Sequence, residues 1–179
     1  MSVYSTVFNK AVIYETLFFN IKSILIYPTI NDLERESKSL YNHFINIYNN
    51  KYLYENSIED AYVKYAPNHV EFNKIVAITY ASVYHEQGEL KRIFKKIVST
   101  NEVNVIQQFL DVLQQLSKDG NLSEPKYYPM LCGYDIINFD IPLLIKRILV
   151  HRKEINNSIP LMLKNLLDSK PWDSNYVLD

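Results

Sequence analysis

Two runs of β-branched and aromatic residues lie close together in the middle of the chain. Residues 74–84 read KIVAITYASVY and residues 90–98 read LKRIFKKIV, with a short segment containing Gly88 between them. Strand-like runs around a short glycine-containing turn are typical of a β-hairpin. We therefore expect a sheet that contains at least one antiparallel pair of strands.

The second run carries four basic residues, Lys91, Arg92, Lys95 and Lys96. We expect them to face water on a solubilising edge strand, because charges on an edge discourage pairing with other chains. A phosphate-binding role for this stretch is the alternative.

Helical and strand-like patterns alternate in the rest of the chain. A helix is expected over 102–117, where apolar residues form one stripe, and a short buried strand follows at 128–133. A hairpin followed by a strand–helix–strand passage favours an α/β fold with a mixed sheet and helices on its faces. The other elements expected are strands at 11–19 and 176–178, a second strand or tucked extension at 21–30, and helices at 33–49 after the N-cap candidates Asn31 and Asp32, at 57–65 after Ser57, at 139–151 and at 159–167.

Composition limits the class of protein. The 179 residues, 47% of them hydrophobic, fit one domain, and the single cysteine, Cys132, fits a reducing cytosol. A net charge of −1 argues against a basic coat that wraps nucleic acid, but not against an enzyme that holds a chain end through metal ions. We expect no secretory signal and no membrane span. The bias toward Tyr, Asn, Ile and Lys suggests a low-GC bacterium or its phage.

Residues 133–147, GYDIINFDIPLLIKR, carry the sharpest candidate for chemistry. Asp135 follows the end of the predicted strand, and Asp140 opens the next helix. Side chains at the carboxyl ends of strands in open α/β sheets face the crevice where ligands bind, and a carboxylate there can hold a divalent metal ion. The alternative is that Asp140 is an N-cap, since Pro142 suits the first helical turn.

This segment resembles the second motif of the DEDD-type 3′–5′ exonucleases. It is most similar to the family related to the exonuclease domain of family B DNA polymerases, and it departs from that pattern at Asp135, where the family has Asn. The likeness extends over about residues 65–179. The matching positions are Glu71 to Ile78, Glu102 with Phe109, Gly133, Tyr134, Phe139, Asp140, Ile141, Pro142, Leu144 and Arg147, and Tyr176 to Asp179.

The resemblance implies a ribonuclease H-like exonuclease fold, with 1–179 as a single domain and a helical insertion at about 31–66. It implies two-metal phosphodiester cleavage with Mg²⁺ or Mn²⁺ held by four carboxylates. Residues 12–16, VIYET, resemble the family's first motif, which makes Glu15 and Asp140 the implied catalytic metal ligands and Asp135 a substitute ligand. Ile13 stands where the family has Asp, and Glu15 is alternatively a solvent-facing strand residue.

The third motif of the family is not found before Asp179, which implies that the C-terminal part of the family fold is missing. The carboxylate set is therefore incomplete, and efficient cleavage by this chain is in doubt. The residues implied to contact nucleic acid are Thr16, Tyr134, Asp135, Phe139, Lys146 and Arg147.

Three of these residues have a simpler alternative. Lys146 and Arg147 are suited to backbone phosphate but also to an exposed helix face. Tyr134 is suited to stacking on a terminal base but also to ordinary packing, as are Tyr127 and Tyr128.

Three functions remain open from the sequence. The first is a metal-dependent exonuclease on DNA, or less readily RNA, 3′ ends. The second is an inactive module of the same fold that binds nucleic acid or a replication or repair protein. The third is a structural or interaction protein, such as a phage component. The histidines lack zinc spacing and there is no glycine-rich phosphate loop, so structural zinc and nucleotide binding are not expected.

Overall fold

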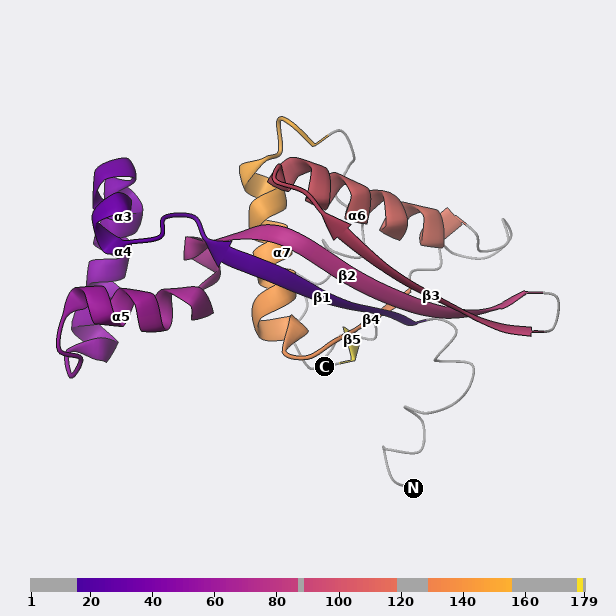
Figure 1. Ribbon diagram of the computed structural model, residues 1–179, viewed down its shortest axis with the longest axis horizontal. Helices are drawn as coiled ribbons and strands as arrows, with labels where there is room; N and C mark the ends of the chain where they lie inside the picture. Colours follow the sequence, from indigo (N-terminus) through magenta and orange to yellow (C-terminus); the bar gives the residue numbers. More distant parts are fainter. Residues whose placement is uncertain (1–15, 87–88, 119–128, 156–176, 179) are drawn as a thin grey trace, which may run out of the picture.

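The computed structural model describes residues 16–86, 89–118, 129–155 and 177–178. The centre of the fold is a five-stranded mixed sheet in the order β3-β2-β1-β4-β5 (Figure 1). β2 is antiparallel to both β1 and β3, whereas β1, β4 and β5 are parallel to one another, so β2 alone runs against the rest. The strands are Thr16–Leu25, Asn73–Glu86, Glu89–Val98, Met130–Cys132 and Val177–Leu178 for β1 to β5.

The predicted mixed sheet with helices is thus confirmed, and so is the hairpin, since β2 and β3 pair in antiparallel register from Ala77↔Val98 to Glu86↔Glu89. The four basic residues of β3 are exposed, as predicted. The terminal strand is confirmed for residues 177–178, which pair with β4.

β1 is one continuous strand, and the prediction of two runs broken at Asn20 is wrong. Its side chains alternate, with Leu17, Phe19 and Ile21 buried and Phe18, Asn20 and Lys22 exposed. Asparagine is rare in strand interiors. Asn20, however, lies on the open face of the sheet, where its polar side chain needs no buried partner.

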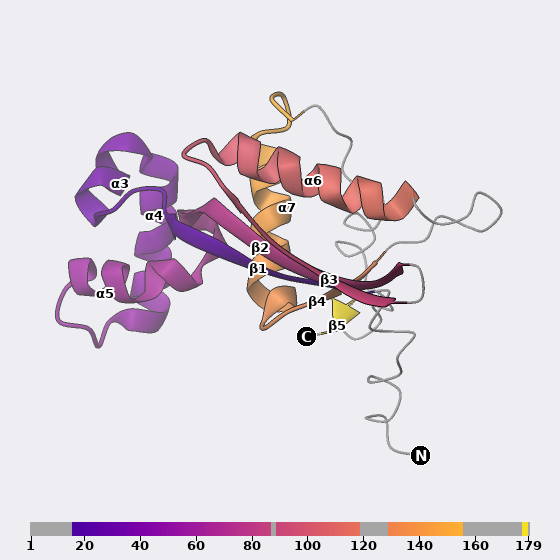
Figure 2. The same cartoon turned by 45° about the vertical axis from the view of Figure 1, so that its right-hand side comes forward.

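Two helices cover the other face of the sheet. α6 (Glu102–Lys118) matches the predicted helix, and its Phe109 packs against Phe19 with ring centroids 5.4 Å apart. α7 (Ile141–Val150) begins two residues later than predicted, because a π-helical turn, η4 (Ile136–Asp140), precedes it. α6 lies along β2 and β3, while α7 crosses the strands more steeply (Figure 2). Both helices contribute to one core with the buried residues of β1 and β2.

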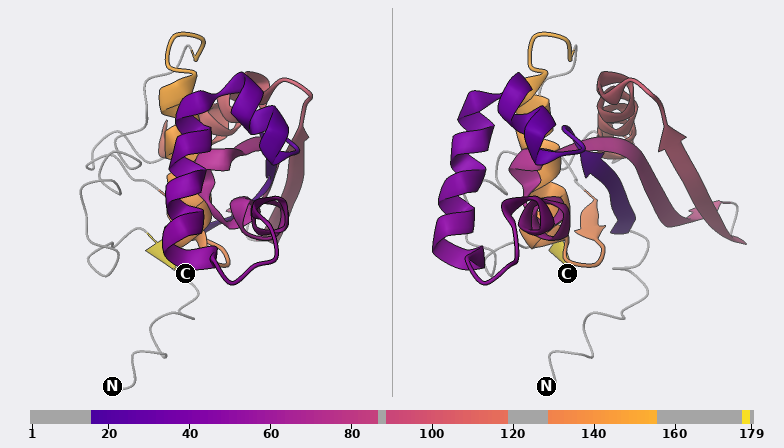
Figure 3. Two further views of the ribbon diagram at one scale, coloured as in Figure 1. Left: turned by 90° about the vertical axis from the view of Figure 1, so that its left-hand side faces the viewer. Right: turned by 60° about the vertical axis from the view of Figure 1, so that its left-hand side comes forward.

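The connection from β1 to β2 is a group of helices at one end of the sheet (Figure 3). A separate cluster of buried side chains holds this group together, in which Phe44 meets Tyr62 and Phe72 edge to face at centroid distances of 5.0 and 5.5 Å. Its helices are α3 (Ile30–Glu36), α4 (Lys38–Ile47), the π-helix η1 (Tyr48–Tyr52) and α5 (Ile58–Tyr65), followed by the 3-10 turns η2 (Ala66–Asn68) and η3 (Val70–Phe72).

The single helix predicted over 33–49 is wrong, because the chain breaks at Ser37, which adopts φ −149° and ψ 83°. The N-cap is Thr29, whose side-chain oxygen accepts from the Asp32 amide, and not Asn31 or Asp32. The predicted cap of α5 is confirmed, since the Ser57 hydroxyl accepts a 3.1 Å hydrogen bond from the Asp60 amide.

Several predictions fall on residues 1–15, 119–128, 156–176 and 179, which lie outside the described part of the chain. These are Glu15, the beginning of the first strand, the tyrosines at 127 and 128 and the helix at 159–167. Among the helices that the structure describes, none is long and apolar enough to cross a membrane.

A half-buried ionic network joins α6, α7 and β2. The Glu102 carboxylate accepts from Arg147 Nε at 2.9 Å, from Arg147 Nη2 at 2.5 Å and from the Ile75 amide at 2.6 Å, and it lies 2.9 Å from His151 Nε2. Burial raises the pKa of the Glu102 carboxyl, but the hydrogen bonds from Arg147, Ile75 and His151 outweigh it and leave the pKa below its usual value. The network therefore depends on an ionised Glu102.

Replacing Glu102 with Gln tests this dependence. The variant leaves the Arg147 guanidinium, whose side chain is 12% exposed, without a counterion, so we expect a loss of about 2–4 kcal/mol in the free energy of unfolding at pH 7. A carboxyl whose pKa is lowered by folding stabilises above its unfolded pKa and loses that contribution as the pH falls through the acidic range. Urea unfolding of E102Q between pH 7 and 4 should thus show a shallower loss of stability than the wild type.

The matched control is Glu34→Gln, which removes an exposed ion pair with Lys38. We expect a change within about 0.5 kcal/mol, because exposed pairs contribute little. Equal effects of the two variants would contradict a stabilising role for the Glu102 network.

Candidate functional site

Asp140 lies where β4, η4 and α7 meet β1. It is 4% exposed, and its Oδ2 accepts a 3.0 Å hydrogen bond from the backbone amide of Ile21 in β1. It occupies the N-cap position of α7, but its backbone is already helical and its side chain makes no capping hydrogen bond. The interpretation of Asp140 as an N-cap is therefore wrong, because its carboxylate is used across the sheet and not along its own helix.

The turn before Asp140 is tightly constrained. A Cβ atom on Gly133 would lie 2.5 Å from the Phe19 carbonyl oxygen and would also collide with the Ile136 side chain. Two residues later, Asp135 adopts a left-handed backbone with φ 54°, and its Oδ1 accepts a 2.8 Å hydrogen bond from Asn138. Asp and Asn are the non-glycine residues that best tolerate this conformation. The local sequence thus turns the chain sharply enough to bring Asp140 back to β1.

Asn20 and Lys22 are the residues on either side of the Ile21 amide that Asp140 binds. Residues two apart in a strand point to the same face, and both side chains are exposed on the open face of the sheet. The positions of β1 that border Asp140 therefore carry an amide and an ammonium group.

The structure brings together only some of the predicted site residues. Thr16 is buried at the start of β1 and pairs with Met130 of β4, while Tyr134 is 90% exposed beyond the end of β4. Asp135 is exposed, and Phe139 is half-buried against the main core.

The other two predicted residues lie farther along α7. Arg147 is seven residues after Asp140, about 10 Å along the helix axis, and its guanidinium binds Glu102. Lys146 is exposed near Glu71. Burial raises the pKa of Glu71, but a hydrogen bond from His43, its own backbone amide and the charge of Lys146 outweigh it, and the net pKa is lowered. Neither cation lies beside Asp140.

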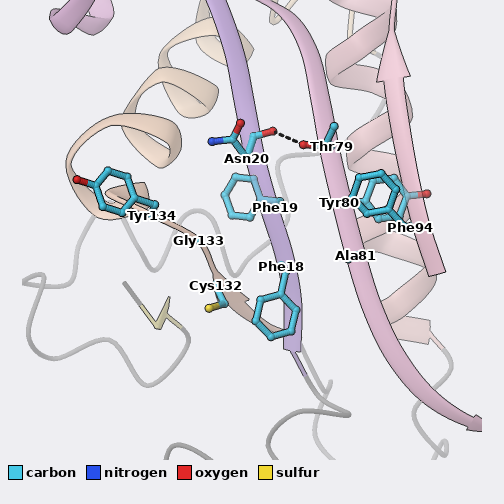
Figure 4. A pocket seen from close by; sticks show the side chains of 10 residues that line it. All are labelled: Phe18, Phe19, Asn20, Thr79, Tyr80, Ala81, Phe94, Cys132, Gly133 and Tyr134. Carbon is cyan, nitrogen blue, oxygen red and sulfur yellow. Dashed lines mark hydrogen bonds between the residues drawn. The ribbon is translucent and has the colours of Figure 1, made fainter. Parts of the chain in front are cut away.

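A shallow cavity of about 280 Å³ opens on the sheet face next to this turn (Figure 4). Three aromatic residues that line it are exposed, Phe18 at 38%, Phe94 at 76% and Tyr134 at 90%. Its lining comes from four neighbouring segments, β1, β2, β3 and the end of β4, and comprises Phe18, Phe19, Asn20, Thr79, Tyr80, Ala81, Phe94, Cys132, Gly133 and Tyr134.

The sequence interpretation missed Phe18, Asn20, Lys22 and Phe94. The signal that could have found the first three is the period-two pattern in residues 17–22, LFFNIK, in which Leu17, Phe19 and Ile21 form the apolar face. Phe94 sits two residues from both Arg92 and Lys96 and is therefore on their face of β3.

The described residues beside Asp140 do not by themselves fit a two-metal centre, because an ammonium group does not bind a cation and an amide brings no charge. Across the described ranges, no group of three or more His, Cys, Asp or Glu side chains is placed to hold a metal ion. The Mg²⁺ or Mn²⁺ site stays a prediction, since Glu15 lies outside the described residues.

Comparisons with known proteins give no identification. No family model matches the chain, and neither does any curated protein or solved structure. The geometry around Asp140 and the adjoining sheet face is therefore the basis for assigning a function.

Gly133→Ala tests whether the close approach of the chain to β1 is required. The added methyl group meets the backbone of Phe19, which cannot move without disturbing β1, so we expect a loss of about 1–3 kcal/mol in the free energy of unfolding, measured in urea. Tyr134→Ala, one residue away on an exposed side chain, is the control and should change stability by less than about 0.5 kcal/mol. A stable G133A protein would show that the turn relaxes easily.

Proposed function

We propose that this chain is a nucleic-acid-binding module of the ribonuclease H-like exonuclease fold, which holds a DNA 3′ end beside Asp140 without cutting it efficiently. The observation that carries the proposal is the place of Asp140, at the start of the helix after β4 and bound to the backbone of β1. This is where the resemblance puts the second-motif carboxylate.

The sheet supports the fold assignment. A ribonuclease H-like sheet has three sequential antiparallel strands extended on the side of the first by two parallel strands, with helices between the third and fourth and between the fourth and fifth. The order β3-β2-β1-β4-β5, with only β2 reversed and with α6 and α7 in those two connections, agrees with that arrangement.

A long-range ion pair also supports it. Glu102 and Arg147 belong to different segments of the resemblance, 45 residues apart in the chain, and they form a bidentate contact in the structure. Two matched positions that bind each other are easier to explain by a shared fold than by chance likeness of short segments.

Binding is favoured over cleavage by the side chains of Asn20 and Lys22, the β1 residues next to Ile21, whose backbone amide binds Asp140. Two-metal hydrolysis needs several carboxylates to hold both ions. Lys22 is instead suited to a phosphate, which an ammonium group binds as a point charge. The replication or repair partner stays a prediction.

Oligonucleotide binding tests the proposal. A 5′-labelled single-stranded DNA of 20 nucleotides should bind in fluorescence anisotropy, with an affinity that falls as salt rises and that drops when the 3′ hydroxyl is blocked by a phosphate. The same oligonucleotide should stay intact on a denaturing gel after incubation with Mg²⁺ or Mn²⁺.

Asp140→Asn is the matched control, since an amide oxygen can still accept from the Ile21 amide. We expect DNA binding to be preserved. If the wild type shortened the oligonucleotide from its 3′ end and D140N did not, the chain would be an active metal-dependent exonuclease. Absence of DNA binding by the wild type would overturn the proposal.

The double variant Asn20→Asp with Lys22→Glu tests the reason given for poor cleavage. It places two carboxylates on the face beside Asp140, and we expect it to gain Mn²⁺ binding, detected as a rise in melting temperature on adding MnCl₂. Adding D140N to the double variant should reduce that rise. A wild type that is stabilised by MnCl₂ as strongly as the double variant would contradict the role assigned to Asn20 and Lys22.

A further inference from the structure

The open face of the sheet carries a row of side chains that crosses three strands. Phe18 of β1 pairs with Ala81 of β2, and Ala81 pairs with Phe94 of β3, so the three side chains point to the same side in register. Neighbouring strands lie about 4.8 Å apart, which sets the strand positions of the two phenylalanines about 10 Å from each other. The small Ala81 side chain occupies the position between the two phenylalanines, and all three residues line the cavity in Figure 4.

Cations flank this row. Arg92 and Lys96 lie two residues to either side of Phe94, share its face and are exposed. The positions paired with them on β2, Val83 and Thr79, are uncharged. The described part of the face is therefore aromatic and positively charged, although the whole chain has a net charge of −1.

Edge protection explains only part of this pattern. Lys95 pairs with Tyr80, whose ring packs against Phe109 of α6, so Lys95 belongs to the helix-covered side of β3. Charges at the edge discourage strand pairing, but a phenylalanine that is 76% exposed at the centre of an edge strand has the opposite effect. Phe94 therefore needs another reason to be exposed there.

Bases and phosphates together match the chemistry of this face. Proteins that bind single-stranded nucleic acid stack successive bases on aromatic side chains and hold the backbone with nearby cations. A protein partner would complement the phenylalanines but would need acidic groups opposite Arg92 and Lys96. Single-stranded nucleic acid supplies bases for the phenylalanines and phosphates for the cations in the same molecule. The face also adjoins the turn before Asp140 through Tyr134.

We propose that Phe18 and Phe94 form a base-stacking platform, with Arg92 and Lys96 as its phosphate contacts, for the nucleotides upstream of the 3′ end. The inference rests on the proposed function, because it extends the same bound strand, and it names the substrate class as single-stranded and read without sequence preference.

Two single-stranded oligonucleotides, one with bases and one without, separate the contribution of stacking from that of charge. One is dT₁₂ and the other is a 12-unit abasic backbone of equal charge, both measured by fluorescence anisotropy. Phe94→Ala and Phe18→Ala should each weaken dT₁₂ binding by about tenfold and leave the abasic strand nearly unchanged, since stacking contributes about 1–3 kcal/mol per base. Lys96→Gln should weaken both strands alike and reduce the slope of affinity against salt.

Val63→Ala is the matched control, because Val63 is 65% exposed on α5, away from the sheet face. It should bind both strands like the wild type, and circular dichroism should show every variant folded. Wild-type dT₁₂ binding that survives both phenylalanine substitutions would overturn the platform and leave the proposed function standing. No binding of dT₁₂ by the wild type would overturn both.

Light scattering tests whether a second copy of this chain occupies the face in place of nucleic acid. If the wild type self-associates, F94A is monomeric and both bind dT₁₂ equally, the face is a contact between copies of this chain and the platform is wrong.

Discussion

The contact between β1 and β4 is the constraint on which the rest of the structure depends. In the described part of the chain, three residue pairs join these strands, from Thr16↔Met130 to Phe18↔Cys132, and they connect the hairpin side of the sheet to β5. β4 ends at Cys132 and is too short to reach the backbone amide of Ile21. That amide donates a hydrogen bond to the Asp140 carboxylate, which therefore takes the place of a neighbouring strand. Buried backbone amides need partners, so this carboxylate completes the edge of β1. Asp140 thus stabilises the fold at the position where the resemblance expects chemistry.

Much of the fold could be predicted because its signals are local. The β2–β3 hairpin, α6 and the Ser57 cap of α5 each follow from patterns within a few residues. The errors arose where a distant partner decides. Asn20 looked like a break because only the open face of the sheet makes room for it, and the split at Ser37 depends on how α3 and α4 pack around their own core.

The site was predictable in part for the same reason. Asp140 could be singled out from its motif, but the choice between capping a helix and binding β1 depends on a residue 119 positions away. Arg147 looked available for phosphate, and only its long-range partner Glu102 shows otherwise. Asp135 stands where the resemblance expects Asn. This difference preserves the backbone conformation, because both residue types suit the left-handed conformation that the turn requires.

The helices between β1 and β2 have a consequence for how this domain can vary. Their core is separate from that of the sheet, and they join it through the adjacent ends of two paired strands. Closing a longer connection costs little additional entropy, so an insertion at such a site is tolerated when it packs on itself. The helical group connects the ends of β1 and β2 in the same way that a hairpin loop would. Its surface is therefore free to acquire or lose a role of its own while the strands beneath keep their register.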